Sequence, residues 1–192
     1  MTACTRRTRE AGQASPLYVF VVASLLFLAL AFFAVGQAGA TRNGAQSAAD
    51  AAALAAARES RDNVDLTIGN LADLLDGALI PTLYGCGASH YYAGQNDAEV
   101  DSCTPLFDGR WGFTVQVTSL NPVGDTVLPG TEDRYAKSTA TAVVVPVCSF
   151  EPADDDDSPS PGALECEGDL LDLDPAKLPD MSDLFEVRLA ED

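Results

Sequence analysis

The longest apolar run of the chain lies near its N-terminus. Leu17 to Val35 are nineteen consecutive residues without charge, and almost all of them are apolar. At a rise of about 1.5 Å per residue, roughly 20 such residues in a helix cross a bilayer core of about 30 Å. The run therefore predicts a transmembrane helix over residues 16–36, with Pro16 in the first helical position, where its missing N–H is harmless.

Helix-favouring sequence continues beyond this run. No proline interrupts the chain between Pro16 and Arg61. Glycines at positions 36, 39 and 44 each lower helix propensity by about 1 kcal/mol relative to alanine, and a later alanine-rich stretch restores it. We therefore predict that the helix continues outside the membrane as a stalk over residues 37–61.

Other apolar patterns follow this helix. Spacings of three and four predict a second, amphipathic helix with Asp62 or Asn63 as its cap and Pro81 at its end; its apolar stripe is Val64, Ile68, Leu71, Leu75 and Leu79. Residues 84–110 are rich in turn formers, and we expect a loop there.

Alternation with a period of two predicts three β-strands. In WGFTVQVT every second residue from Trp111 onward is apolar, which indicates a half-buried strand. The stretch RYAKSTATAVVVPV predicts a second strand, in which Pro146 requires an edge or an end. Apolar residues at positions 185, 187 and 189 predict a third. The fold class is therefore α+β: a long N-terminal helix, an amphipathic helix and a small antiparallel sheet.

These elements divide the chain into six parts. We expect a cytoplasmic tail at 1–15, the transmembrane helix at 16–36, the helical stalk at 37–61 and an extracytoplasmic α+β domain at 62–150. An acidic, partly disordered loop is expected over 151–183, because FEPADDDDSPSPG combines charge with prolines. A strand and tail at 184–192 complete the chain.

Charge is unevenly placed along the chain. The formal net charge is −18, and residues 151–192 hold fifteen acids against Lys177 and Arg188. Such an acidic surface repels nucleic acid, so no nucleic-acid partner is expected. Arg6, Arg7 and Arg9 precede the apolar run. Basic residues in this position predict a single-pass membrane protein with its N-terminus inside and its C-terminal domain extracytoplasmic.

A cleaved secretory signal is the alternative to this anchor. Ala38-Gly39-Ala40 fits a signal-peptidase site. The apolar core of such signals usually has about 7–15 residues. The nineteen residues found here favour an uncleaved signal anchor in the cell membrane.

The distribution of the five cysteines agrees with this topology. Cys4 precedes the apolar run, and Cys86, Cys103, Cys148 and Cys166 follow it, where an oxidising compartment favours disulfides. We favour pairing the first two of these four and the last two, because each bond closes a short loop with little apolar surface to bury. The other two connectivities, and unpaired buried thiols, stay open.

Catalytic and metal-binding patterns are absent from the sequence. His90 is the only histidine, and its spacing from the cysteines does not match a zinc site. Asp154–Asp157 lack the alternation of a calcium loop and indicate a solvated acidic linker. No phosphate loop, G-x-S-x-G or H-E-x-x-H motif occurs. We expect no enzyme activity, no cofactor and no metal.

Small residues recur every four positions along the predicted helix: Gly36, Ala40, Gly44, Ala48, Ala52 and Ala56. Such a row lets a partner helix approach closely, since dispersion forces act over a smooth surface. It could equally lie against the protein's own sheet, or reflect alanine-rich composition alone. Asp50 interrupts the run and either pairs with a cation on a partner or faces water.

Short signatures surround the apolar run. Gly12-Gln13-Ala14 leads into it, Asn43-Gly44 follows it, and Ala49-Asp50-Ala51-Ala52-Ala53-Leu54-Ala55 comes just past the membrane. Over residues 10–60 the chain resembles the TadE/TadG-like proteins, pilin-like components of the Flp-type, tight-adherence pilus machinery of bacteria. The resemblance implies a pilin-like fold and, as partners, other proteins of a Tad/Flp-type pilus or secretion apparatus. Copies of the chain itself are further candidates.

One position departs from the pilin pattern. Precursors resembling the Flp class are cut after a glycine and carry glutamate at the fifth mature position. After a cut at Gly12 that position would be Leu17. Because of this difference, the resemblance favours a pilus-assembly accessory or minor pilin-like structural protein that acts through helix packing, and not a major pilin. The alternative is a membrane-tethered module whose extracytoplasmic domain binds a ligand or cation.

Overall fold

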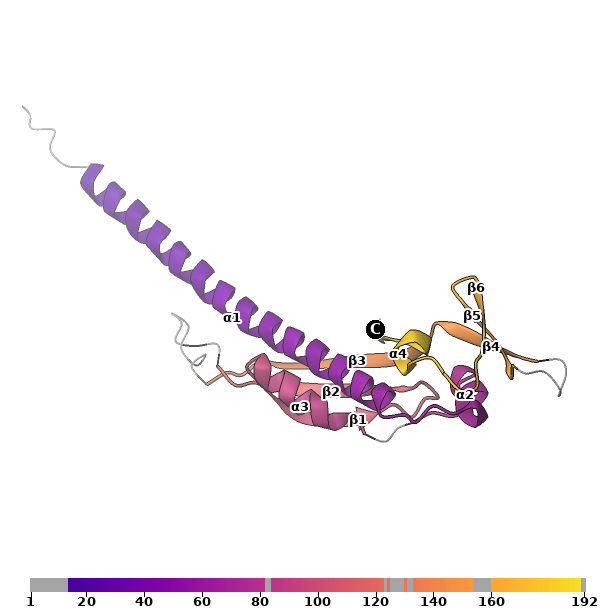
Figure 1. The fold of residues 1–192 in the computed structure, drawn as a ribbon. Helices are drawn as coiled ribbons and strands as arrows, with labels where there is room; N and C mark the ends of the chain where they lie inside the picture. Colours follow the sequence, from indigo (N-terminus) through magenta and orange to yellow (C-terminus); the bar gives the residue numbers. More distant parts are fainter. Residues whose placement is uncertain are drawn as a thin grey trace, which may run out of the picture.

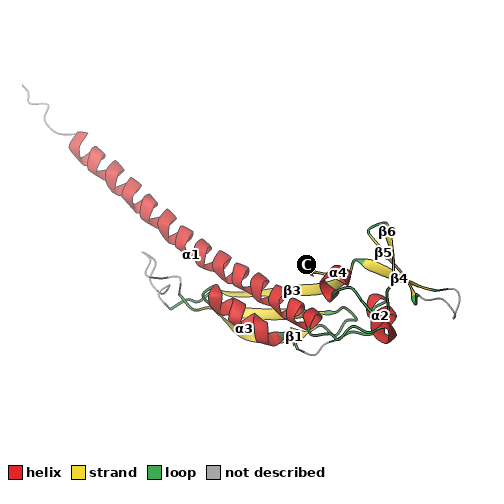
Figure 2. Ribbon diagram, in the orientation of Figure 1, coloured by secondary structure: helices red, strands yellow, loops and turns green. Residues whose placement is uncertain are grey.

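The structure is a computed structural model that describes residues 14–81, 84–122, 124, 130, 133–153 and 160–190. A long helix, α1 (Ala14–Asp62), lies with its second half on an antiparallel sheet, and its first half projects away from the rest of the molecule (Figure 1 and Figure 2). The predicted α+β class is confirmed. The predicted cytoplasmic tail, with its basic cluster and Cys4, falls almost entirely outside the described residues.

α1 joins the predicted span and the predicted stalk in one helix. Its 49 residues correspond to a length of about 74 Å. In the first half the large apolar side chains are exposed, with Phe27 at 70% and Phe32 at 76%. Within the described residues, α1 holds the one helical stretch long and apolar enough to cross a membrane, and only 6% of that stretch is buried.

The main sheet has four antiparallel strands in the order β1-β2-β3-β7. Their bounds are β1 Ala98–Pro105, β2 Gly112–Ser119, β3 Lys137–Pro146 and β7 Phe185–Leu189. The three predicted strands are β2, β3 and β7. Pro146 is the last residue of β3, beyond the end of the pairing with β2, so its missing N–H removes no bond between those two strands.

The core lies between α1 and this sheet. Alanines fill the helix side, and the fully buried ones are Ala48, Ala49, Ala52, Ala53, Ala56 and Ala57. Large residues fill the sheet side, with Phe113, Val115 and Val117 of β2 at 1% exposure or less. Small side chains on the helix allow its backbone to come close to the sheet, and the apolar side chains of β2 then occupy the space between them.

The expected loop over residues 84–110 is wrong. This segment forms α3 (Cys86–Gln95) beside α1, followed by the edge strand β1. A disulfide joins Cys86 of the helix to Cys103 of the strand. A Glu59 carboxylate oxygen accepts the Ala88 N–H at 2.7 Å and so caps α3. The disulfide and this cap hold a helix that has no apolar stripe of its own.

The amphipathic helix is shorter than predicted. α2 spans Ile68–Leu75 and is capped by Thr67, not by Asp62, which ends α1, or by Asn63. Its buried residues are Leu71, Leu74 and Leu75, whereas Ile68 and Leu79 of the predicted stripe are exposed. α2 has eight residues and packs its C-terminal half against the domain, whereas the predicted stripe runs from Val64 to Leu79.

Much of the expected acidic loop over residues 151–183 forms a second sheet. Its antiparallel strands are β4 (Cys148–Pro152), β5 (Gly162–Cys166) and β6 (Asp169–Asp172), and the short helix α4 (Met181–Leu184) leads into β7. The disulfide between Cys148 and Cys166 joins directly paired residues of β4 and β5. Both disulfides thus have the favoured pairing. The run Asp154–Asp157 lies outside the described residues.

Candidate functional site

α1 changes its surroundings twice along its length. Leu17–Val35 form the exposed apolar part, most of residues 36–44 are exposed but small or polar, and residues 45–60 pack on the domain. The nine residues from 36 to 44 correspond to about 14 Å of helix. The span and the core of the domain are therefore separated by less than three helical turns.

The predicted row of small residues divides into an exposed part and a buried part where α1 meets the domain. Gly36, Ala40 and Gly44 are exposed, and a Cβ atom added to either glycine would meet no heavy atom within 4 Å. Ala48 and Ala52, by contrast, are fully buried in the protein's own core. Each step of four residues turns about 40° around a helix, so a row of this spacing drifts from the free side of α1 onto the sheet side.

Asp50 is bound within its own helix. The Gln46 side-chain amide donates a hydrogen bond to an Asp50 carboxylate oxygen at 2.8 Å. The Gln46 side-chain oxygen Oε1 accepts from the Ser138 hydroxyl of β3. The carboxylate is partly buried at the margin of the packed surface. In this structure Asp50 helps to seat α1 on the sheet.

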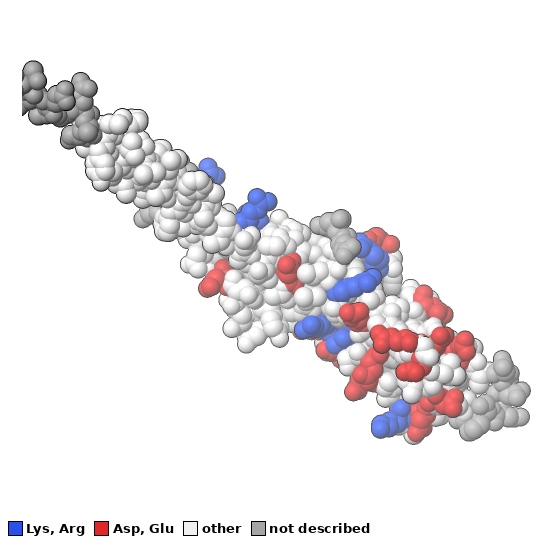
Figure 3. Space-filling view, turned by 90° about the horizontal axis from the view of Figure 1, so that it is seen from above, with Lys and Arg blue, Asp and Glu red and all other residues white. Residues whose placement is uncertain are grey.

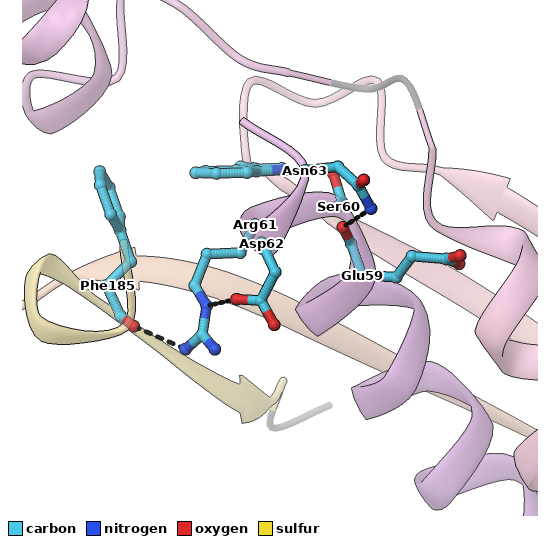
Figure 4. Close-up of polar contacts among 7 residues, drawn as sticks. Glu59, Ser60, Arg61, Asp62, Asn63 and Phe185 are labelled. Carbon is cyan, nitrogen blue, oxygen red and sulfur yellow. Dashed lines mark hydrogen bonds and ion pairs between the residues drawn. The ribbon is translucent and has the colours of Figure 1, made fainter. Parts of the chain in front are cut away.

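The polar C-terminal end of α1 connects the helix to the rest of the domain. Figure 4 shows Arg61, whose guanidinium donates to the Asp62 carboxylate at 2.8 Å and to the Phe185 carbonyl at 3.1 Å. Fully buried Ser60 bonds to Trp111 and to the Pro81 carbonyl. Sequence reasoning missed these contacts. The change from alanine to Arg-Glu-Ser-Arg-Asp at residues 58–62 was the signal that could have indicated them.

Acidic side chains gather at the end of the molecule farthest from the apolar helix, whereas the surface around the emerging helix is mostly uncharged (Figure 3). Three ion pairs occur among the described residues: Arg61–Asp62, Arg110–Asp108 and Lys137–Asp101. The hydrogen bond from the Arg110 side chain lowers the pKa of the Asp108 carboxyl. Most carboxylates of the described residues therefore have no ion-pair partner.

The described part of the chain contains no group of three or more His, Cys, Asp or Glu side chains arranged to hold a metal ion. His90 is exposed on α3. The two cysteines nearest to it form a disulfide, and a disulfide sulfur cannot act as a thiolate ligand.

Comparison with known proteins finds a family at α1. Residues 12–59 match the family model described as "Putative Flp pilus-assembly TadE/G-like". This is the family that the sequence resembles, and the match supports a role related to pilus assembly. It covers 48 of the 192 residues and ends before α2. No curated protein and no solved structure matches the chain.

Proposed function

We propose that the protein is an accessory or minor pilin-like structural component of a Tad/Flp-type pilus or secretion apparatus, and that it packs α1 against helices of partner proteins. The observation that carries this proposal is the division of α1. The segment that matches the family is exposed and apolar over one half and forms the core of a domain over the other. A partner bound to the exposed half thereby positions the domain.

The contact surface that we propose is the exposed part of the small-residue row. Gly36, Ala40 and Gly44 present little more than backbone, which allows another helix to approach closely where the two helices leave the lipid. Ala48 and Ala52 are not part of it, because they contact the protein's own core. Asp50 is excluded too, since its carboxylate accepts a hydrogen bond from Gln46.

The proposed orientation places the N-terminus inside and the domain outside. Three arginines within the first ten residues support it, because basic residues are retained on the cytoplasmic side of a span. The two disulfides support it as well, since such bonds persist in oxidising compartments. We propose a single pass through the cell membrane on these grounds.

Substitution of Gly44 by leucine tests this function. The added side chain has open space around it in the structure, so the domain is expected to fold normally, and only the approach of a partner helix is blocked. We expect at least a fivefold lower recovery of pilus-assembly proteins with the tagged Gly44→Leu chain from crosslinked native membranes, corresponding to about 1 kcal/mol of lost association.

Gly39→Leu is the matched control. Gly39 is also an exposed helical glycine with no atom within 4 Å of an added Cβ, but it lies about 140° around the helix from Gly44. Its recovery of partners should equal that of the unmodified chain. If the unmodified chain recovers no pilin, platform or other pilus-assembly protein, the proposed function is wrong.

A further inference from the structure

A groove runs along the outer side of α1 where α3 lies beside it. It has a volume of about 430 Å³, and its apolar lining comes from Ala51, Leu54 and Ala55 of α1 with Ala88 and Tyr92 of α3. Ala51 and Leu54 are only partly buried, so this side of the helix faces away from the sheet. The groove is separate from the core and open to a partner.

The free side of α1 that leads into this groove follows a seven-residue repeat. Its members are spaced by 4, 3, 4, 3 and 4 residues: Ala40, Gly44, Ser47, Ala51, Leu54 and Arg58. On a helix these positions stay within a sector of about 80°. A mean spacing of 3.5 residues is the one at which a second helix packs along the first. We call this set the α1 seam.

The α1 seam is continuous with the apolar span. Extended by the same repeat toward the N-terminus, it passes Phe33 and Leu26, whose side chains are 64% and 61% exposed. A helix that leaves the same bilayer beside α1 can therefore follow the seam into the groove without a bend. A soluble partner would meet only the distal part of this surface.

Three charged side chains lie at the distal end of the groove, and Arg58 is the one without a partner. Glu59 accepts the Ala88 N–H at 2.7 Å, and Asp62 pairs with Arg61 at 2.8 Å. Among the described residues Arg58 has neither a hydrogen bond nor an ion pair. A partner bound in the groove would shield the Arg58 guanidinium from water. A carboxylate on that partner, placed beside Arg58, would replace the lost hydrogen bonds to water.

A second copy of this chain would bring its own arginine to that position. In a parallel symmetric pair of α1 helices each seam residue faces its own counterpart, so the two Arg58 side chains would meet. Like charges brought together in a desolvated contact oppose association. The charge at the end of the seam therefore favours a different protein.

We propose that the groove binds the helix of a distinct protein anchored in the same membrane, which packs small or apolar residues along the α1 seam and places a carboxylate beside Arg58. This inference rests on the proposed function in requiring an anchored α1, and it adds the course of the contact and the chemistry of the partner.

Site-specific photo-crosslinking in native membranes tests the proposal on the full chain. A benzophenone amino acid is introduced singly at seam positions 47, 51 and 54, and at the exposed positions 38 and 42 away from the seam. We expect one adduct with a different protein at the seam positions and at least about tenfold less at the two others. Mass spectrometry should locate the bond in an apolar or small-residue helical segment that carries an acid.

A charge reversal provides the second measurement. Among the described residues Arg58→Glu removes no hydrogen bond or ion pair, so the chain should still fold, which thermal unfolding of the variant can check. The adduct from position 51 should nevertheless fall by about tenfold, because a carboxylate would then face a carboxylate.

Three results would overturn the proposal: no adduct at the seam positions, adducts at positions 38 and 42 as strong as those at the seam, or an adduct of twice the mass of the chain. Failure of this proposal can be told apart from failure of the proposed function. A seam-bound helix from a protein unrelated to pili would leave the groove established and the pilus role wrong. Recovery of pilus-assembly proteins that depends on Gly44, with no adduct at positions 47, 51 and 54, would show the reverse.

Discussion

Ser60 shows how one small polar residue connects the end of α1 to two other segments. Its hydroxyl accepts the Trp111 indole N–H at 3.0 Å and donates to the Pro81 carbonyl at 3.1 Å. The side chain is fully buried, and Trp111 packs edge-to-face on Phe185 with ring centroids 5.4 Å apart. A hydroxyl can donate and accept at once, which an amide N–H or a carbonyl alone cannot do.

Replacing Ser60 by alanine should therefore destabilise the domain. The Trp111 N–H would be left buried without an acceptor, and such a loss costs about 1–3 kcal/mol. The free energy of unfolding can be measured by denaturant titration in detergent micelles, with tryptophan fluorescence as the probe. Ser47→Ala, on the exposed side of the same helix, is the control and should change stability by less than about 0.5 kcal/mol. Equal effects of the two substitutions would contradict the buried contact.

At the scale of elements, the patterns that have a clear period could be predicted. The continuous α1 and strands β2, β3 and β7 follow from apolar runs and alternation. β1 was missed because its pairing shifts register between Val100 and Ser102, which breaks the period of two. α3 was missed because it packs with Ser89 and Ala93, which give no apolar stripe.

The contact surface on α1 was predicted only in part, for a geometric reason. A repeat of four residues drifts around a helix, so it ran from the free Gly36 onto the buried Ala52. Which side of the helix meets the sheet depends on β2 and β3, far along the chain. Alanine carries no signal that separates a core position from a docking position.

Ala52→Leu distinguishes these two roles of alanine. Because Ala52 is fully buried against the domain, the larger side chain should overpack the core and lower the free energy of unfolding by about 1–3 kcal/mol. Ala38→Leu, at an exposed position of the same helix, should leave stability unchanged. Thermal unfolding followed by circular dichroism measures both. A stable Ala52→Leu variant with weakened partner binding would instead assign Ala52 to a partner contact.

At the scale of the whole molecule, one helix serves both as the apolar segment and as the core of the domain. The domain begins about 14 Å beyond the apolar run, so it lies close to the proposed membrane surface and not on a long stalk. The two disulfides hold α3 and the second sheet in place, where little apolar surface is available. The exposed side of α1 leaves a straight path from the apolar span to the α3 groove.

The continuity of α1 through residues 36–44 is the central claim, because anchor and domain are mechanically one body only if this helix is unbroken. A pulsed electron-spin distance measurement tests it directly, with labels on cysteines introduced at Leu26 and Ser47 in a Cys4→Ser chain reconstituted into lipid nanodiscs. An unbroken helix predicts a single narrow distribution centred near about 32 Å. A broad distribution, or one centred well below that distance, would show that the chain bends or unwinds after the span and would contradict the account.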